Sequence, residues 1–264
     1  MKCVIAIACL FAGCALADGA HRRAFYSLVS NPSAVVLPDV TRGLVAQWKL
    51  DDNAANTTVV DSYGSYGGTL LNSNSSVMNV TGLIDGAFSF PQTFTNRVNV
   101  TSVAALNPYP MTLMAWEKTT SKFPANVNAI GFVAGKYVSG SNNGYWMGPF
   151  AGKAYCGYFG SGIHYAYGQG ASATILTNGL WHLLAMVVST NGTTIYIDGI
   201  QDGLIAWTGT PLQTSTSQAF HIGNQSDNSG DNGYAWVGTI DETRLYAVAL
   251  SSNEILTVYN KFNP

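Results

Sequence analysis

From Gly43 almost to the end of the chain, short apolar runs alternate with clusters of Gly, Asn and Asp. The predicted strands fall at 44–50, 87–90, 97–100, 111–116, 130–134, 181–189, 194–197 and 219–222. The turn residues between them, such as Asp198-Gly199, have the chemistry that β-hairpins require. Many short strands joined in this way predict an all-β fold, an antiparallel β-sandwich of the jelly-roll type.

One segment near the end follows a helical pattern instead. Ser251 is a good N-cap residue, and Glu254 three positions later completes a capping box. Ile255, Leu256 and Tyr259 then supply an apolar stripe. We therefore expect one short C-terminal helix.

The first residues have the pattern of a secretory signal. A positive charge at Lys2 precedes an apolar run that ends at the small-x-small sequence Ala15-Leu16-Ala17. Residues 1–17 are therefore predicted as a signal peptide, residues 18–42 as a linker or N-terminal arm, and residues 43–264 as one domain. We expect a secreted or cell-surface protein.

The cysteines leave one alternative open. Phe11-Ala12-Gly13-Cys14 loosely resembles a bacterial lipobox, so a lipoprotein anchored through Cys14 is an alternative to a freely secreted chain. After removal of the signal only Cys156 remains, and the mature chain has no partner for an internal disulfide.

Charge excludes some partners. Only 10% of the residues are charged, against an average near 25%, and the formal net charge is -2. The chain has no basic patch of the kind that nucleic acid binding requires. After the signal, the sequence contains no apolar stretch long enough for a membrane span.

Aromatic residues are concentrated between Tyr137 and Tyr167, where they alternate with glycines. In a strand over 163–167, Tyr165 and Tyr167 lie on one face and His164 on the other. Rings with polar tips stack on sugars, while amides and imidazoles bond to hydroxyls, although about half of these aromatics must fill the core. The candidate ligand-binding residues are Trp146, Tyr155, His164, Tyr165 and Tyr167.

The sequence contains little evidence for a hydrolytic active site. The sequence contains three glutamates, Glu117, Glu242 and Glu254, and none has the spacing of the paired carboxylates that sandwich glycosidases use. The sequence also lacks a Gly-x-Ser-x-Gly nucleophile elbow. We therefore favour a protein without catalytic activity.

Several motifs occur in an order that resembles a known family. They are Gly43 to Asp51, Gly67-Gly68-Thr69-Leu70, Gly86 to Phe90, Met111 to Trp116, Gly179-Leu180-Trp181-His182, Ile195 to Gly199, Phe220 to Gly223, Gly238 to Tyr246 and Ala249 to Ile255. The chain resembles the laminin-G-like, concanavalin A-like jelly-roll domains of secreted bacterial proteins. The resemblance implies a sandwich over roughly 43–259, but it does not fix a function, because this fold hosts many.

The resemblance also implies a metal. Related sandwiches hold a structural Ca²⁺ through an Asp in the Gly-x-Ile-Asp-Glu motif, which here is Asp241. Backbone carbonyls near Asp51 and near Gly67 or Gly68 would complete the site, because calcium takes six to eight oxygen ligands. The opposing interpretation is that Asp241 only caps a turn or pairs with Arg244.

Taken together, these patterns predict a secreted, non-catalytic module that binds a carbohydrate or a cell-surface partner. One alternative is a uronate-polysaccharide lyase, because 162–169 contains the Tyr, His and Gln side chains that some sandwich lyases use. The other is a structural or adhesive surface subunit. The oligomeric state and the identity of the ligand stay open.

Overall fold

A computed structural model describes residues 39–91, 95–121, 130–138, 140–170, 174–225 and 234–262. The predicted signal peptide, Cys14 and most of the predicted linker lie outside these residues. No helix among the described residues is long and apolar enough to cross a membrane.

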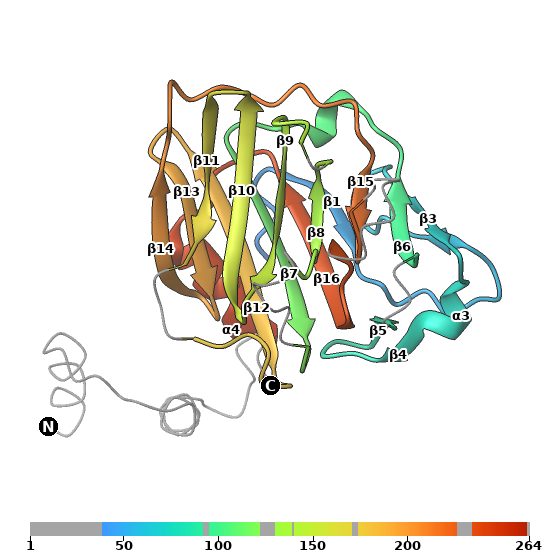
Figure 1. Cartoon of the computed structure of the whole chain (residues 1–264). Helices are drawn as coiled ribbons and strands as arrows, with labels where there is room; N and C mark the ends of the chain where they lie inside the picture. Colours follow the sequence, from blue (N-terminus) through green and yellow to red (C-terminus); the bar gives the residue numbers. More distant parts are fainter. Residues whose placement is uncertain are drawn as a thin grey trace, which may run out of the picture. The chain divides into compact units, whose positions relative to one another are not determined.

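Two eight-stranded antiparallel sheets make up the domain (Figure 1). Sheet A has the order β14-β13-β12-β7-β16-β5-β4, with β1 also paired to β16. Its strands are β1 (Leu44–Trp48), β4 (Asn79–Thr81), β5 (Gly86–Phe90), β7 (Met111–Lys118), β12 (Trp181–Ser189), β13 (Gly192–Ile197), β14 (Ile200–Ala206) and β16 (Gly238–Tyr246).

Sheet B has the order β11-β10-β9-β8-β15-β6-β3-β2. Its strands are β2 (Thr58–Val59), β3 (Gly68–Leu71), β6 (Arg97–Val100), β8 (Ala134–Lys136), β9 (Gly144–Phe150), β10 (Lys153–Ser161), β11 (His164–Gln169) and β15 (Phe220–Ile222). A short helix α3 (Ser75–Met78) and a 3-10 turn η1 (Ala104–Leu106) lie in the connections. The predicted antiparallel β-sandwich is confirmed.

The main core lies between the two sheets, and period-two alternation along each strand fills it. On β12, Leu184, Met186 and Val188 point into this core. The alternate residues Leu183, Ala185 and Val187 belong to a second cluster on the opposite face of sheet A. An uninterrupted apolar strand is therefore the consequence of burial on both faces.

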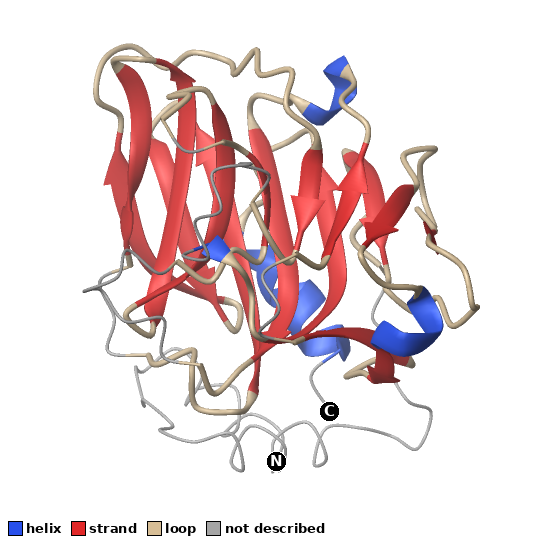
Figure 2. Cartoon of the chain, turned by 45° about the vertical axis from the view of Figure 1, so that its right-hand side comes forward, coloured by secondary structure: helices blue, strands red, loops and turns tan. Residues whose placement is uncertain are grey.

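Helix α4 (Ser252–Phe262) covers that opposite face (Figure 2). The capping box forms as predicted, because the Ser251 amide donates to Glu254 Oε2 at 2.8 Å and the Glu254 amide donates to Ser251 Oγ at 3.3 Å. Arg42 Nε donates to Glu254 Oε1 at 2.7 Å. This bond lowers the pKa of Glu254 to about 2. Ile255 and Val258 are the buried residues of the helix.

One local prediction was wrong. The run 130–134 is not a regular strand, because β15 pairs with β8 only at Ala134 and Gly135. Before these residues, Ile130 forms an isolated bridge with Phe150. Residues 226–233 lie outside the described part of the chain.

Candidate functional site

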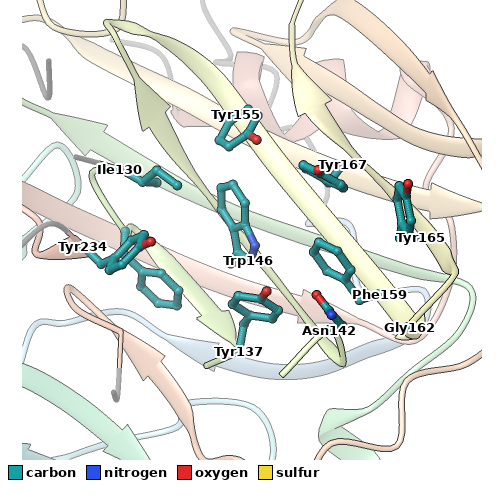
Figure 3. Close-up of a pocket in the computed structure, with 11 residues that line it drawn as sticks. Ile130, Tyr137, Asn142, Trp146, Tyr155, Phe159, Gly162, Tyr165, Tyr167 and Tyr234 are labelled. Carbon is teal, nitrogen blue, oxygen red and sulfur yellow. The ribbon is translucent and has the colours of Figure 1, made fainter. Parts of the chain in front are cut away.

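The outer face of sheet B, which points away from sheet A, contains a pocket of about 350 Å³ (Figure 3). It is lined by Ile130, Phe132, Tyr137, Asn142, Trp146, Tyr155, Phe159, Gly162, Tyr165, Tyr167 and Tyr234. None of these lining residues is charged. The polar groups of the pocket are tyrosine hydroxyls, one indole and one amide, together with backbone.

Strand alternation places these aromatics on the open face. On β9, Tyr145 and Met147 lie in the core, so Trp146 points outward. On β10, Cys156 and Tyr158 lie in the core, and the flanking residues Tyr155 and Phe159 line the pocket. Within the aromatic stretch, alternate residues along each strand therefore point into the core or toward the pocket.

The rings contact one another around Trp146 and Phe159. Trp146 and Tyr155 have ring centroids 4.9 Å apart. Phe159 stacks on Tyr167 at 5.1 Å and on Tyr137 at 5.2 Å, with interplanar angles of 27° and 25°. Such contacts hold aromatic side chains in defined orientations before a ligand arrives.

A glycine lies between two residues that line the pocket. Gly157 pairs with Trp146 on one side and with Tyr167 on the other. A Cβ at this position would lie 3.0 Å from Trp146 Nε1 and 3.0 Å from Tyr167 Cβ. The absence of a side chain lets the indole and the tyrosine approach each other over the strand.

Depth and protonation vary across the pocket. Trp146 is 5% exposed, whereas Tyr167 at the rim is 42% exposed. Burial raises the pKa of Tyr155 to about 12, and neighbouring tyrosines, Tyr167 first, act in the same direction. Burial also raises the pKa of Tyr137. Both hydroxyls therefore stay protonated at neutral pH and are hydrogen-bond donors.

Four of the five sequence-predicted binding residues, Trp146, Tyr155, Tyr165 and Tyr167, come together in this pocket. His164 does not line it, because its Nδ1 lies 2.8 Å from the carbonyl oxygen of Thr210. The Tyr and His side chains that motivated the lyase alternative are thus separated.

The sequence indicated some of the remaining pocket residues and gave no indication of others. Tyr137 and Phe159 belong to the aromatic-rich stretch that was singled out. Ile130 and Tyr234 come from distant segments, and nothing in their local sequence indicates that they meet.

No glutamate lies at the pocket. Glu117 is fully buried inside the sandwich without a hydrogen bond to either carboxyl oxygen. Burial, with the charge of Asp198, raises its pKa well above the usual range. Glu242 accepts from Gln47 at 2.6 Å and from Arg244 at 2.9 Å, and Glu254 caps helix α4.

The predicted metal ligand Asp241 is buried in sheet A. Its Oδ2 accepts from the amides of Leu83 at 2.9 Å and Ile84 at 3.1 Å, whereas Oδ1 is enclosed without a partner. Burial raises its pKa to about 8, and the charges of Glu242 and Asp51 act in the same direction.

The neighbours of Asp241 differ in part from those expected. The turn 82–86 lies against it, whereas Gly68 pairs with Val100 in the other sheet. No group of three or more His, Cys, Asp or Glu among the described residues is arranged to hold a metal. A cation at Asp241 would therefore depend on backbone carbonyls.

Solved structures with the same fold include carbohydrate-binding domains. Domain 4 of AbnA, a GH43 extracellular arabinanase from Geobacillus stearothermophilus in complex with arabinotriose, is 18% identical with a TM-score of 0.57, over 82% of this chain and 98% of that domain. The binding domain of Paraclostridial Mosquitocidal Protein 1 is 12% identical with a TM-score of 0.59, over 81% of this chain. Botulinum neurotoxin type C, whose cell entry depends on interaction with two ganglioside molecules, is 14% identical with a TM-score of 0.56, over 84%.

The chain spans about half the length of the two toxin chains, 53% and 52% respectively. At these identities the likeness shows the fold alone. No curated protein matches the chain at a significant level. The model of one family matches residues 92–256, more than half of the sequence, and the chain therefore belongs to the concanavalin A-like lectin/glucanases superfamily.

Proposed function

We propose that this protein is a non-catalytic module that binds a carbohydrate in the aromatic pocket of sheet B. The observation that carries the proposal is a pocket of about 350 Å³ lined by rings with polar tips, with no charged side chain among its described lining residues. Sites for small ligands have this composition, with apolar walls and a few polar groups that fix orientation. The faces of Trp146 and Tyr155 would stack on sugar rings, and the hydroxyl of Tyr155 would donate to a sugar oxygen.

The similar structures support a sugar as the ligand. One of them is complexed with arabinotriose, and another belongs to a toxin that interacts with gangliosides. Both identities are below 20%, so the pocket chemistry of this chain carries the proposal and these proteins suggest the first probes.

Affinity electrophoresis and calorimetry with arabinotriose and a panel of plant and bacterial polysaccharides test this function. We expect Tyr167→Ala to weaken binding at least tenfold, because it removes an exposed ring of the pocket. Tyr63→Ala is the matched control, since Tyr63 is 51% exposed on a different part of the surface. Both variants should keep the stability of the parent within about 0.5 kcal/mol.

Equal binding by the two variants would reject the pocket as the binding site. An increase in absorbance from unsaturated uronate products would instead favour the lyase alternative. If no glycan of the panel is retained, and light scattering shows concentration-dependent assembly, the adhesive or structural alternative is favoured.

We also propose a structural calcium ion at Asp241. The Oδ1 of Asp241 is enclosed without a partner, and burial disfavours the charged form of this carboxyl, raising its pKa to about 8, so that a cation bound there would compensate a costly buried charge. A calcium ion would take this oxygen as a ligand and draw its remaining ligands from nearby backbone carbonyls. The ion would add stability and would supply no chemistry at the pocket.

Calorimetric melting curves test the calcium site. Ca²⁺ at one hundred times its Kd stabilises a protein by about 2.7 kcal/mol. For a domain of this size this corresponds to a Tm higher by about 5 to 10 °C. EDTA should reverse the shift, and Asp241→Asn should abolish it while Asp202→Asn on strand β14 keeps it. A Tm that does not respond to Ca²⁺ or EDTA in the parent protein would reject the site.

A further inference from the structure

A straight row of cross-strand neighbours runs across the outer face of sheet B and passes through the floor of the pocket. The register connects Tyr167 with Gly157, Gly157 with Trp146, Trp146 with Gly135, Gly135 with His221, His221 with Asn99, and Asn99 with Thr69. The residues on either side of Gly157, Trp146, His221 and Asn99 belong to the core, so these members of the row lie on the outer face of the sheet. Adjacent strands lie about 4.8 Å apart, which places Asn99 about 14 Å from Trp146 along the row.

The sheet face at the far end of this row differs from the pocket, because a cation lies there beside Asn99. Arg97 lies two residues before Asn99 on β6 and therefore on the same face. The backbone of Arg97 pairs with Leu71 in the sheet, but its guanidinium forms no ion pair or hydrogen bond with a described residue. Of its guanidinium nitrogens, Nε is enclosed without a partner, and the terminal nitrogens are not enclosed.

His221 provides a second orphaned polar atom beside this cation. It is 1% exposed, and its Nε2 lies 3.0 Å from Asn99 Oδ1, while Nδ1 has no partner. Burial, together with the charge of Arg97, lowers the pKa of His221 to about 3. His221 is therefore neutral at physiological pH and does not add to the positive charge.

A half-buried guanidinium without a carboxylate loses hydration without gaining a counter-charge. Arginine in such a position is well suited to bind a carboxylate or a sulfate through its planar set of donors. We propose that Arg97 forms a subsite for an anionic group, a carboxylate or a sulfate ester, on the glycan whose ring occupies the aromatic pocket. The placement within one oligosaccharide rests on the proposed function, whereas the affinity of Arg97 for an anion does not.

Binding to matched sugars tests the link between subsite and pocket. The probes are oligosaccharides of galactose, of galacturonate and of galactose 6-sulfate with equal numbers of rings. We expect the acidic members to bind at least tenfold more tightly than the neutral member, with an advantage that falls as salt rises. Arg97→Gln should remove this advantage and leave neutral binding unchanged, and Lys118→Gln, which removes an exposed charge on sheet A, should preserve it. The relative affinities for galacturonate and sulfate identify the anion.

A second measurement separates this inference from the glycan proposal. The Nε–H resonance of Arg97, assigned through its loss in Arg97→Gln, is followed by NMR during titration with galacturonate, galactose 6-sulfate and galactose. We expect a saturable shift with the acidic sugars and none with galactose. If the shift persists in Tyr167→Ala, the anion subsite at Arg97 is supported even if the pocket proves not to bind a glycan. Absence of a saturable shift with either acidic sugar would overturn the inference, whether or not the pocket binds a glycan.

Discussion

Both sheets carry aromatic side chains on the face that points away from the other sheet, but among the described residues a helix covers that face on sheet A, whereas on sheet B the aromatic side chains line a pocket. On sheet A, Trp116 stacks on Tyr259 of helix α4 at 5.6 Å and is 2% exposed. On sheet B, Trp146 packs against Tyr155 at 4.9 Å and opens into a pocket. Contiguous aromatic surface that a protein leaves uncovered is typical of a binding site. The same residue types are therefore structural under the helix and available for a ligand on sheet B.

The buried charges of the two sheets differ in the same way. In sheet A, Arg244 is fully paired, to Glu242 at 2.9 Å and to Asp39 at 2.7 Å. In sheet B, Arg97 has no acidic partner among the described residues. On the covered face the arginine is paired within the chain, whereas on the open face no described residue pairs with the guanidinium of Arg97.

Substitution of the covered tryptophan gives the largest expected effect. We expect Trp116→Ala to destabilise the fold by about 3 to 5 kcal/mol, because it removes a buried indole from between sheet A and helix α4. Urea unfolding measures this loss, with Leu180→Ala, a substitution at a 62% exposed residue, as the control near zero. Any glycan that the parent protein binds should bind the folded variant with unchanged affinity. A loss of affinity like that of Tyr167→Ala, at intact stability, would show that the two faces are not functionally distinct.

The locally encoded parts of this comparison could be predicted from the sequence. The strands and the capping box of α4 follow from alternation and from residues three positions apart, so β12 and the helix start were predicted correctly. The pairing of Tyr165 with Tyr167 on one face likewise needs only the period of a strand. His164 fell on the opposite face by the same rule, but its binding role was inferred from residue type alone.

The non-local parts could not be predicted in this way. Trp116 and Trp146 both occur in strands, and only the position of helix α4, far away in sequence, determines which of them is covered. Tyr234 reaches the pocket through a tertiary contact that leaves no local pattern. Arg97 looks like any surface arginine in the sequence, because the absence of a partner is a property of the assembled sheet.

The smallest expected effect concerns the glycine beneath the open rings. In Gly157→Ala the new Cβ would meet Trp146 Nε1 and Tyr167 Cβ at 3.0 Å, so both side chains must shift outward. We expect the affinity for glycan to fall several-fold, with a loss of about 1 to 2 kcal/mol in unfolding free energy from local overpacking. Gly168→Ala is the control, because its Cβ would meet Ile205 at an ordinary 3.5 Å and should leave binding unchanged. If calorimetry gives the two variants the same affinity, the spacing of the rings above Gly157 does not determine binding, and the pocket acts only as exposed apolar area.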